Sequence, residues 1–190
     1  MRATGGEWPR LYGEGMNIDD DSQGRRAEIR EFLDSWHSFP AFLRDRYLTV
    51  VASNELARRV SPSFEVGVNL ARFTFLEPIV ERRSREWEDV AEAVAAELRD
   101  SVDQHEQDAS FSDIVGELSA KSRTFSQVWA EETPAKVAGM AWFDTELAGP
   151  MTLAYQQLRV PENYDDVLVV WRPTDAASQL AMSRLIDAAR

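Results

Sequence analysis

The stretch VAGMAWFDTELAGPMTLAYQQLRVPENYDDVLVVWR, residues 137–172, decides the fold class. It holds three strand-like runs, at 137–145, 151–160 and 167–172, in which apolar residues alternate with polar ones or β-branched residues gather. Two short breaks rich in Pro, Gly or Asn separate the runs, at 148–150 and 161–163. Links this short join antiparallel neighbours, because parallel strands need a crossover of a dozen or more residues. The pattern therefore predicts a three-stranded antiparallel meander.

A second strand-rich segment lies nearer the N-terminus. Two apolar runs, 41–43 and 48–52, flank the charged residues 44–46. We expect these runs to pair as a hairpin with 44–46 as its turn. The side chain of Asn54 is placed to cap a short helix that follows the hairpin.

Apolar residues spaced three and four apart predict the remaining elements as helices. The first spans 25–37, and residues 1–24 before it are expected to form a poorly ordered leader to one domain at 25–190. The middle block, 69–132, is expected to be mostly helical. Ser84 is placed to cap a helix that runs to about 102, and Ser110 with Asp113 has the spacing of a capping box for the helix that follows it. A short helix at 125–129 and a closing helix at 175–189, capped by Thr174, complete the chain.

The resulting order is helix, two strands, helices, three strands, helix. This is the element order of a PAS-like domain, an α+β fold with a five-stranded antiparallel sheet, helices over one face and a small apolar cavity between them. Other α+β sandwiches share the same element count.

Composition narrows the function classes. The chain has 190 residues, 44% of them hydrophobic and 10% aromatic, which is too apolar for an acidic disordered chain. No apolar run is long enough to span a bilayer, and no signal peptide is visible, so we expect a cytoplasmic protein without membrane contact. The formal net charge of −12 disfavours direct binding of nucleic acid, which needs clustered cations. The chain has no cysteine, which excludes disulfides and thiolate zinc sites.

Several motifs resemble one family, that of the MmyB-like ligand-binding domains of helix-turn-helix transcription regulators. The most specific is NLARFTFLEP at 69–78. The resemblance continues in order, from about residue 25 to 178, through PAFLRD at 40–45, VVASNELA at 50–57, WEDVA at 87–91, VGELSAKS at 115–122, FSQVW at 125–129, MTLAYQQLRVP at 151–161 and VLVVW at 167–171.

The resemblance implies a PAS-like sensor domain that binds a small apolar ligand, with a fatty acid as the favoured class. Family members normally carry an N-terminal DNA-binding helix-turn-helix, whereas only some 24 residues precede the first matching helix here. The chain is therefore expected to be a free-standing sensor or to have its DNA-binding domain missing from this sequence.

A fatty acid needs a dry cavity for its tail and a hydrogen-bond donor for its carboxylate. Arg72 is the candidate donor, because it lies inside the apolar stretch 70–76. The alternative is that Arg72 pairs with Glu77 or caps a nearby backbone carbonyl. The candidate cavity wall consists of Phe73, Phe75, Trp87, Val90, Val94, Phe125 and Trp129 from the helices and Leu153, Tyr155 and Val169 from the sheet. Any of these residues could instead simply pack in the core.

Catalytic signals are weak. The chain has only two histidines, of which His105 sits in a polar segment typical of a solvated helix end. Neither a phosphate-binding loop nor a Gly-x-Ser-x-Gly motif occurs. We expect no enzyme activity, no metal and no cofactor. The alternative function is a protein-interaction module with a closed cavity, which would form a homodimer or bind a separate DNA-binding protein.

Overall fold

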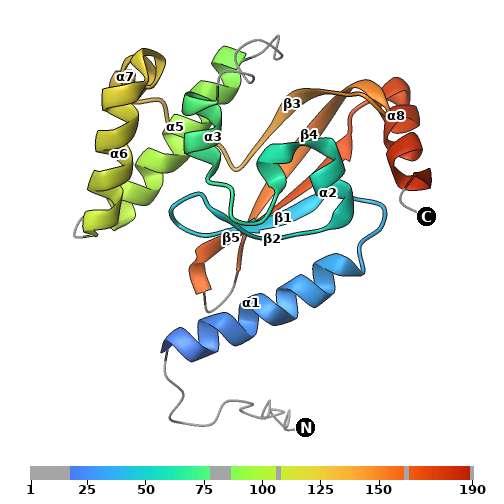
Figure 1. Ribbon diagram of the computed structural model, residues 1–190, viewed down its shortest axis with the longest axis horizontal. Coiled ribbons are helices and arrows are strands. Elements are labelled where there is room, and N and C mark those ends of the chain that lie inside the picture. The colour runs from blue at the N-terminus through green and yellow to red at the C-terminus, as the bar shows by residue number, and fades with distance from the viewer. Residues whose placement is uncertain (1–17, 78–86, 106–107, 161–162, 189–190) are drawn as a thin grey trace, which may run out of the picture.

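Five antiparallel strands form a single sheet in the order β2-β1-β5-β4-β3 (Figure 1). The computed structural model describes residues 18–77, 87–105, 108–160 and 163–188. The strands are β1 (Ala41–Arg44), β2 (Val50–Ser53), β3 (Ala138–Thr145), β4 (Gly149–Val160) and β5 (Asn163–Pro173). β3, β4 and β5 form the predicted meander, and β5 also pairs with β1, which joins the meander to the β1–β2 hairpin in one sheet. The predicted α+β fold with a PAS-like five-stranded antiparallel sheet is confirmed.

The helices follow the predicted sequence of elements, with shifted ends. They are α1 (Ile18–Asp34), α2 (Glu55–Val60), η1 (Pro62–Phe64), α3 (Leu70–Leu76), α5 (Trp87–Gln104), α6 (Ala109–Lys121), α7 (Arg123–Ala130) and α8 (Ala176–Asp187). α1 begins at Ile18, inside the stretch assigned to the leader, because the predicted boundary was drawn at the first apolar repeat rather than at the helix itself. Residues 1–17 lie outside the described residues.

Helix capping follows local polar chemistry. Asn54 caps α2 as predicted, with its side chain accepting from the Ala57 N–H. The predicted capping box at Ser110 is wrong: Asp108 caps α6 and accepts from the Ser110 N–H. Asp175, one residue after the predicted Thr174, caps α8. The predicted cap Ser84 lies outside the described residues.

The β1–β2 turn differs from the prediction. Arg44 belongs to β1 and is buried, and the turn spans residues 45–49. The Asp45 carboxylate accepts from the backbone N–H groups of Tyr47 and Thr49, both at 2.9 Å, and so fixes the turn. Leu48 has φ of 64°, the left-handed region that is costly for a branched residue, and its side chain is fully buried. Burial of Leu48 among the helices stabilises this backbone conformation.

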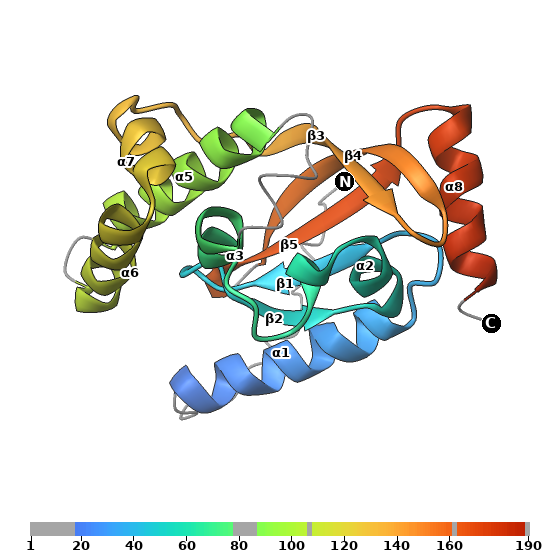
Figure 2. The ribbon, with the colours of Figure 1, turned by 45° about the horizontal axis from the view of Figure 1, so that its top comes forward.

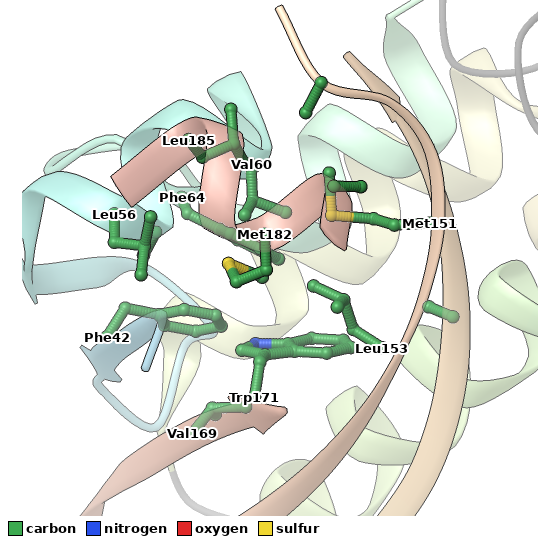
Figure 3. Close-up of a cluster of buried hydrophobic side chains, with 14 of the residues drawn as sticks. Phe42, Leu56, Val60, Phe64, Met151, Leu153, Val169, Trp171, Met182 and Leu185 are labelled. Carbon is green, nitrogen blue, oxygen red and sulfur yellow. The ribbon is translucent and has the colours of Figure 1, made fainter. Parts of the chain in front are cut away.

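The inner face of the sheet carries the larger part of the core (Figure 3). We call this cluster the sheet core. Phe42 and Trp171 project from the sheet and pack against α2, η1 and α8, with Phe64 stacked on Phe42 at 4.6 Å between ring centroids. Its buried members are Phe42, Val50, Leu56, Ala57, Val60, Phe64, Ala141, Ala148, Met151, Leu153, Val167, Val169, Trp171, Ala181, Met182 and Leu185.

A separate apolar cluster, the helical core, holds α3, α5, α6 and α7 together at one end of the sheet (Figures 1 and 2). Its buried members are Leu48, Ala71, Phe75, Ala91, Ala95, Leu98, Phe111, Ile114, Leu118 and Phe125. The buried members of the two clusters do not overlap, and the partly buried Leu70 packs against both. The helices α3 and α5 to α7 therefore form a unit, the helical unit, with its own hydrophobic core.

α1 covers part of the opposite face of the sheet. Leu33 of this helix is 1% exposed and packs with Leu43 and Val160. Arg26 forms two hydrogen bonds of 2.7 Å with Asp166 of β5, whose side chain is fully buried. This ion pair fixes α1 to the sheet. None of the described helices is long and apolar enough to cross a membrane.

Candidate functional site

A line of polar side chains joins α5 to the inner face of the sheet. The residues of α5 that take part are three or four positions apart and so share one face of the helix. We call this contact the polar seam; it consists of Glu97, Asp100 and Gln104 of α5, His105 directly after that helix, and Arg44, Gln157, Arg159 and Asp165 of the sheet. The helical unit thus meets the sheet along α5 through charges and amides rather than through apolar packing.

The buried end of the polar seam is a charged triad. Arg44 Nη2 lies 3.2 Å from Glu97 Oε2 and donates to Gln157 Oε1 at 3.1 Å. The Gln157 amide in turn donates to Glu97. Burial raises the pKa of Glu97, and the positive charge of Arg44 partly opposes that shift. Arg44 is 5% exposed, so its charge depends on nearby acceptors.

The other end of the seam is open to solvent. Arg159 donates to Asp100 at 3.3 Å and to Gln104 at 3.1 Å, with both charged side chains about half exposed. His105 Nε2 lies 3.0 Å from Asp165 Oδ1 and its Nδ1 lies 2.8 Å from the Ser101 carbonyl oxygen. Exposed pairs of this kind contribute little to stability, about 0–1 kcal/mol each.

A cavity of about 60 Å³ lies against the triad. Four positively charged side chains line it, Arg44, Arg46, Lys136 and Arg159, against three carboxylates, Glu97, Asp100 and Asp165. It has room for a few water molecules and is smaller than the roughly 150 Å³ that holds a benzene-sized guest. In this state it therefore accommodates a small polar group, not an acyl chain.

Three buried nitrogens of the described residues have no hydrogen-bond partner: Arg44 Nε, Trp87 Nε1 and Trp171 Nε1. Buried donors without an acceptor are rare in folded proteins. Arg44 is the one that lines the cavity. Its fork of N–H groups therefore holds an unused donor beside a cavity with an excess of positive side chains.

The inner face of β4 changes character along its length. Arg159 and Gln157 belong to the polar seam, Tyr155 is half buried, and Leu153 is fully buried in the sheet core. Alternate residues of a strand share a face, so these four side chains form one row. Burial raises the pKa of the Tyr155 hydroxyl, as does the negative charge of Glu97. The row leads from charged through aromatic to apolar side chains.

The predicted cavity wall divides between the two cores. Phe75, Trp87, Val94, Phe125 and Trp129 pack in or against the helical core, and Leu153, Tyr155 and Val169 in or against the sheet core. Phe73 and Val90 are partly exposed and belong to neither. None of these residues lines the cavity beside Arg44. The structure does not bring them together around one apolar space, and their contact with a ligand stays a prediction.

Arg72 lies on the surface of the helical unit. Its Nε donates to Glu117 of α6 at 2.7 Å, so its partner is not the predicted Glu77. Lys121 donates to the same carboxylate at 2.8 Å, and the two cations lower the pKa of Glu117 to about 2. Arg72 does not line the cavity, and its role as a head-group donor stays a prediction.

Sequence reasoning missed Arg44 and Glu97, although each carries a signal. Arg44 is two positions from Phe42, so the strand period places both on the inner face of the sheet. Glu97 is three positions from Val94 and lies beside the buried Leu98, on the apolar side of α5. Among the described residues, no group of three or more His, Asp or Glu side chains could hold a metal ion.

Comparison with known proteins gives one family. The family model described as "MmyB-like transcription regulator ligand binding domain" matches residues 26–185. No curated protein matches the chain. A solved structure to which the chain is similar is the PAS domain of Bordetella pertussis BvgS, with 10% sequence identity, a TM-score of 0.36, and coverage of 88% of this chain and 99% of that one.

Proposed function

Because this chain belongs to the family of MmyB-like transcription regulator ligand-binding domains, we propose that it is a sensor that binds a small apolar molecule with an acid group, a fatty acid being the favoured class. We place it in the cytoplasm as part of, or partner to, a DNA-binding regulator. The proposal includes no catalytic step.

The polar seam is the observation that carries the proposal. Separating two apolar surfaces costs roughly 25 cal/mol for each Å² exposed to water. Parting α5 from the sheet instead breaks polar contacts that water can replace, and those at the exposed end are weak. Leu70 and the hairpin tip at Leu48 keep the helical unit attached. The helical unit can therefore move away from the sheet without loss of its own core.

The inner face of β4 fits an amphipathic ligand in one orientation. Its charged end beside Arg44 suits an acid group, and the aromatic and apolar residues that follow, Tyr155 and Leu153, suit a tail. Each methylene removed from water stabilises the complex by roughly 0.8 kcal/mol. A tail needs more room than the cavity of about 60 Å³, so ligand entry requires the seam to open.

Native mass spectrometry of gently purified protein tests the proposal, together with thermal unfolding in the presence of saturated fatty acids from eight to eighteen carbons. We expect a co-purified acyl lipid or a rise in melting temperature that grows with chain length and then falls. The fatty-acid proposal is refuted if the purified protein carries no lipid and its melting temperature does not change with a fatty acid of any of these chain lengths.

One observation favours the alternative, an interaction module. On the outer face of the sheet, Met140 is 67% and Leu158 47% exposed, and Phe32 of the adjacent α1 is 57% exposed. Large apolar side chains left exposed on this side of the sheet are available to a protein partner. Light scattering after size exclusion distinguishes the two functions: a dimer that Leu158→Glu converts to a monomer, with no response to fatty acids, supports the alternative.

A further inference from the structure

We propose that Arg44 is the head-group site, and that a ligand carboxylate takes the place of Glu97 on Arg44 and Gln157 and so releases α5 from the sheet. This inference rests on the proposed function and adds the residues and the mode of signalling to it. It assigns to Glu97 the role of an internal stand-in for the acid group of the ligand.

The donors of Arg44 and Gln157 already form a carboxylate site. Arg44 Nη2 lies 3.2 Å from the Glu97 carboxylate, and the Gln157 amide donates to it. Arg44 is 5% exposed, lines the cavity and keeps Nε without an acceptor. A guanidinium with an unused N–H can bind a second carboxylate in the two-pronged geometry that arginine favours.

We expect the ligand carboxylate to replace Glu97 on Arg44 rather than to bind beside it, because of the charges involved. Arg44 and Glu97 together are neutral, and a second carboxylate on the same buried cation would leave one negative charge uncompensated away from water. Glu97 lies at the edge of the cavity with Lys136, an exposed cation that can accept it once it leaves Arg44. The raised pKa of Glu97 also makes its protonation easier than that of an exposed glutamate.

Loss of Glu97 from Arg44 removes the buried contact of the polar seam. What then holds α5 along this line is the exposed set, Arg159 with Asp100 and Gln104, and His105 with Asp165. Such contacts exchange readily with water. Carboxylate binding at Arg44 is thereby linked to movement of α5, and an alcohol of the same chain length lacks the charge to cause it.

The test compares dodecanoate with dodecan-1-ol on three variants, with affinity from calorimetry. Glu97→Gln removes the competing anion, so dodecanoate should bind roughly tenfold tighter and dodecanol unchanged. Arg44→Gln should weaken dodecanoate by roughly tenfold or more and leave dodecanol within about twofold. The double variant Arg44→Gln with Glu97→Gln leaves no buried charge unpaired, and it should bind both probes equally even if the single Arg44 variant fails to fold.

Glu117→Gln, which disrupts the surface pair with Arg72, is the matched control and should bind both probes as wild type does. Hydrogen exchange provides the second readout: dodecanoate, but not dodecanol, should speed exchange at the C-terminal half of α5. Equal binding of dodecanoate by the wild type and the double variant overturns the inference and leaves the proposed function standing.

A wild type that binds neither probe refutes the fatty-acid proposal, and acetate then decides the head-group site by itself. Acetate should shift the NMR signal of the Arg44 Nε–H group, more strongly in Glu97→Gln than in the wild type. The absence of any shift up to molar acetate overturns the inference.

Discussion

Replacement of Asn54 by alanine should destabilise the protein more than the loss of any ordinary helix cap. Asn54 is almost fully buried and makes four hydrogen bonds to the backbone. Its Oδ1 accepts from the N–H groups of Ala57 at 2.9 Å and Ala41 at 3.2 Å. Its Nδ2 donates to the carbonyls of Trp36 at 3.0 Å and Phe39 at 2.8 Å. One side chain therefore joins α2, β1 and the segment that follows α1.

The magnitude follows from the groups that alanine leaves unpaired. Each buried backbone group without a partner costs about 1–3 kcal/mol. The N–H groups of Ala41 and Ala57 contribute most of this cost, because an N–H has one hydrogen and loses its hydrogen bond with Asn54. The carbonyls of Trp36 and Phe39 add less. We expect Asn54→Ala to lower the free energy of unfolding by about 3–5 kcal/mol, a large share of a typical total of about 5–15 kcal/mol.

Urea unfolding followed by circular dichroism measures the loss. Ser122→Ala is the matched control, because Ser122 caps α7 with one hydrogen bond, to the Phe125 N–H at 3.1 Å, and its removal should cost about 1 kcal/mol. Asn54→Asp keeps the acceptor oxygen but places a carboxylate against two carbonyls, so its loss of unfolding free energy should lie between the losses for Asn54→Ala and Ser122→Ala. A loss for Asn54→Ala no larger than that for Ser122→Ala would refute the reasoning.

Three further substitutions probe other parts of the molecule. A Cβ at Gly139 would lie 2.8 Å from Tyr155 Cε1, so Gly139→Ala should cost about 1–2 kcal/mol in urea unfolding and become neutral in a Tyr155→Ala background. Folding lowers the pKa of Glu117 from 4.5 to about 2, so its ion pairs stabilise the protein above pH 4.5 and lose that effect as the pH falls through about 2. The difference in free energy of unfolding between the wild type and Glu117→Gln should therefore shrink between these two pH values. A difference that stays constant would contradict the prediction. Arg26→Ala removes one ion pair of the buried Asp166, so the free energy of unfolding should fall by about 2–3 kcal/mol and α1 should lose hydrogen-exchange protection. Unchanged protection would show that this ion pair does not hold α1 to the sheet.

The sheet could be predicted from the sequence because its signals are local. Residues 137–172 alternate with the period of a strand and are divided by turns too short for any crossover. Their pairing as β3, β4 and β5 therefore needed no knowledge of the rest of the chain. The cap that Asn54 forms on α2 was predictable for the same reason, since that hydrogen bond lies within the first turn of the helix; its bonds to Ala41, Trp36 and Phe39 were not predicted.

The site could not be predicted, because it depends on contacts between distant elements. Arg44 is followed by Asp45 and Arg46, a run that indicates a surface turn. The structure buries Arg44 through Glu97 and Gln157, which lie 53 and 113 positions further along the chain. No local pattern in the sequence contains that pairing.

The division of the interior follows from the same contacts. Helical spacing places Phe75 and Phe125 on apolar faces but does not say which apolar surface each face meets. The prediction took the sheet as that surface. The structure shows the helices packing on one another, with Leu48 of the hairpin tip inserted among them.

This division determines how the domain can transmit a signal. A helical unit packed through the sheet core could not move without exposing that core to water. Here the helical unit meets the sheet along α5 through the polar seam and is anchored to it at Leu48 and Leu70, so it can rotate about that anchor while the packing of its helices is kept. On the far side of the sheet, Arg26 and Asn54 tie α1 and the segment after it to β5, β1 and α2. A displacement at Arg44 can therefore reach α1 by two routes: through β1 itself, where Leu43 next to Arg44 packs against Leu33 of α1, and through Asp166 of the neighbouring β5, which binds Arg26.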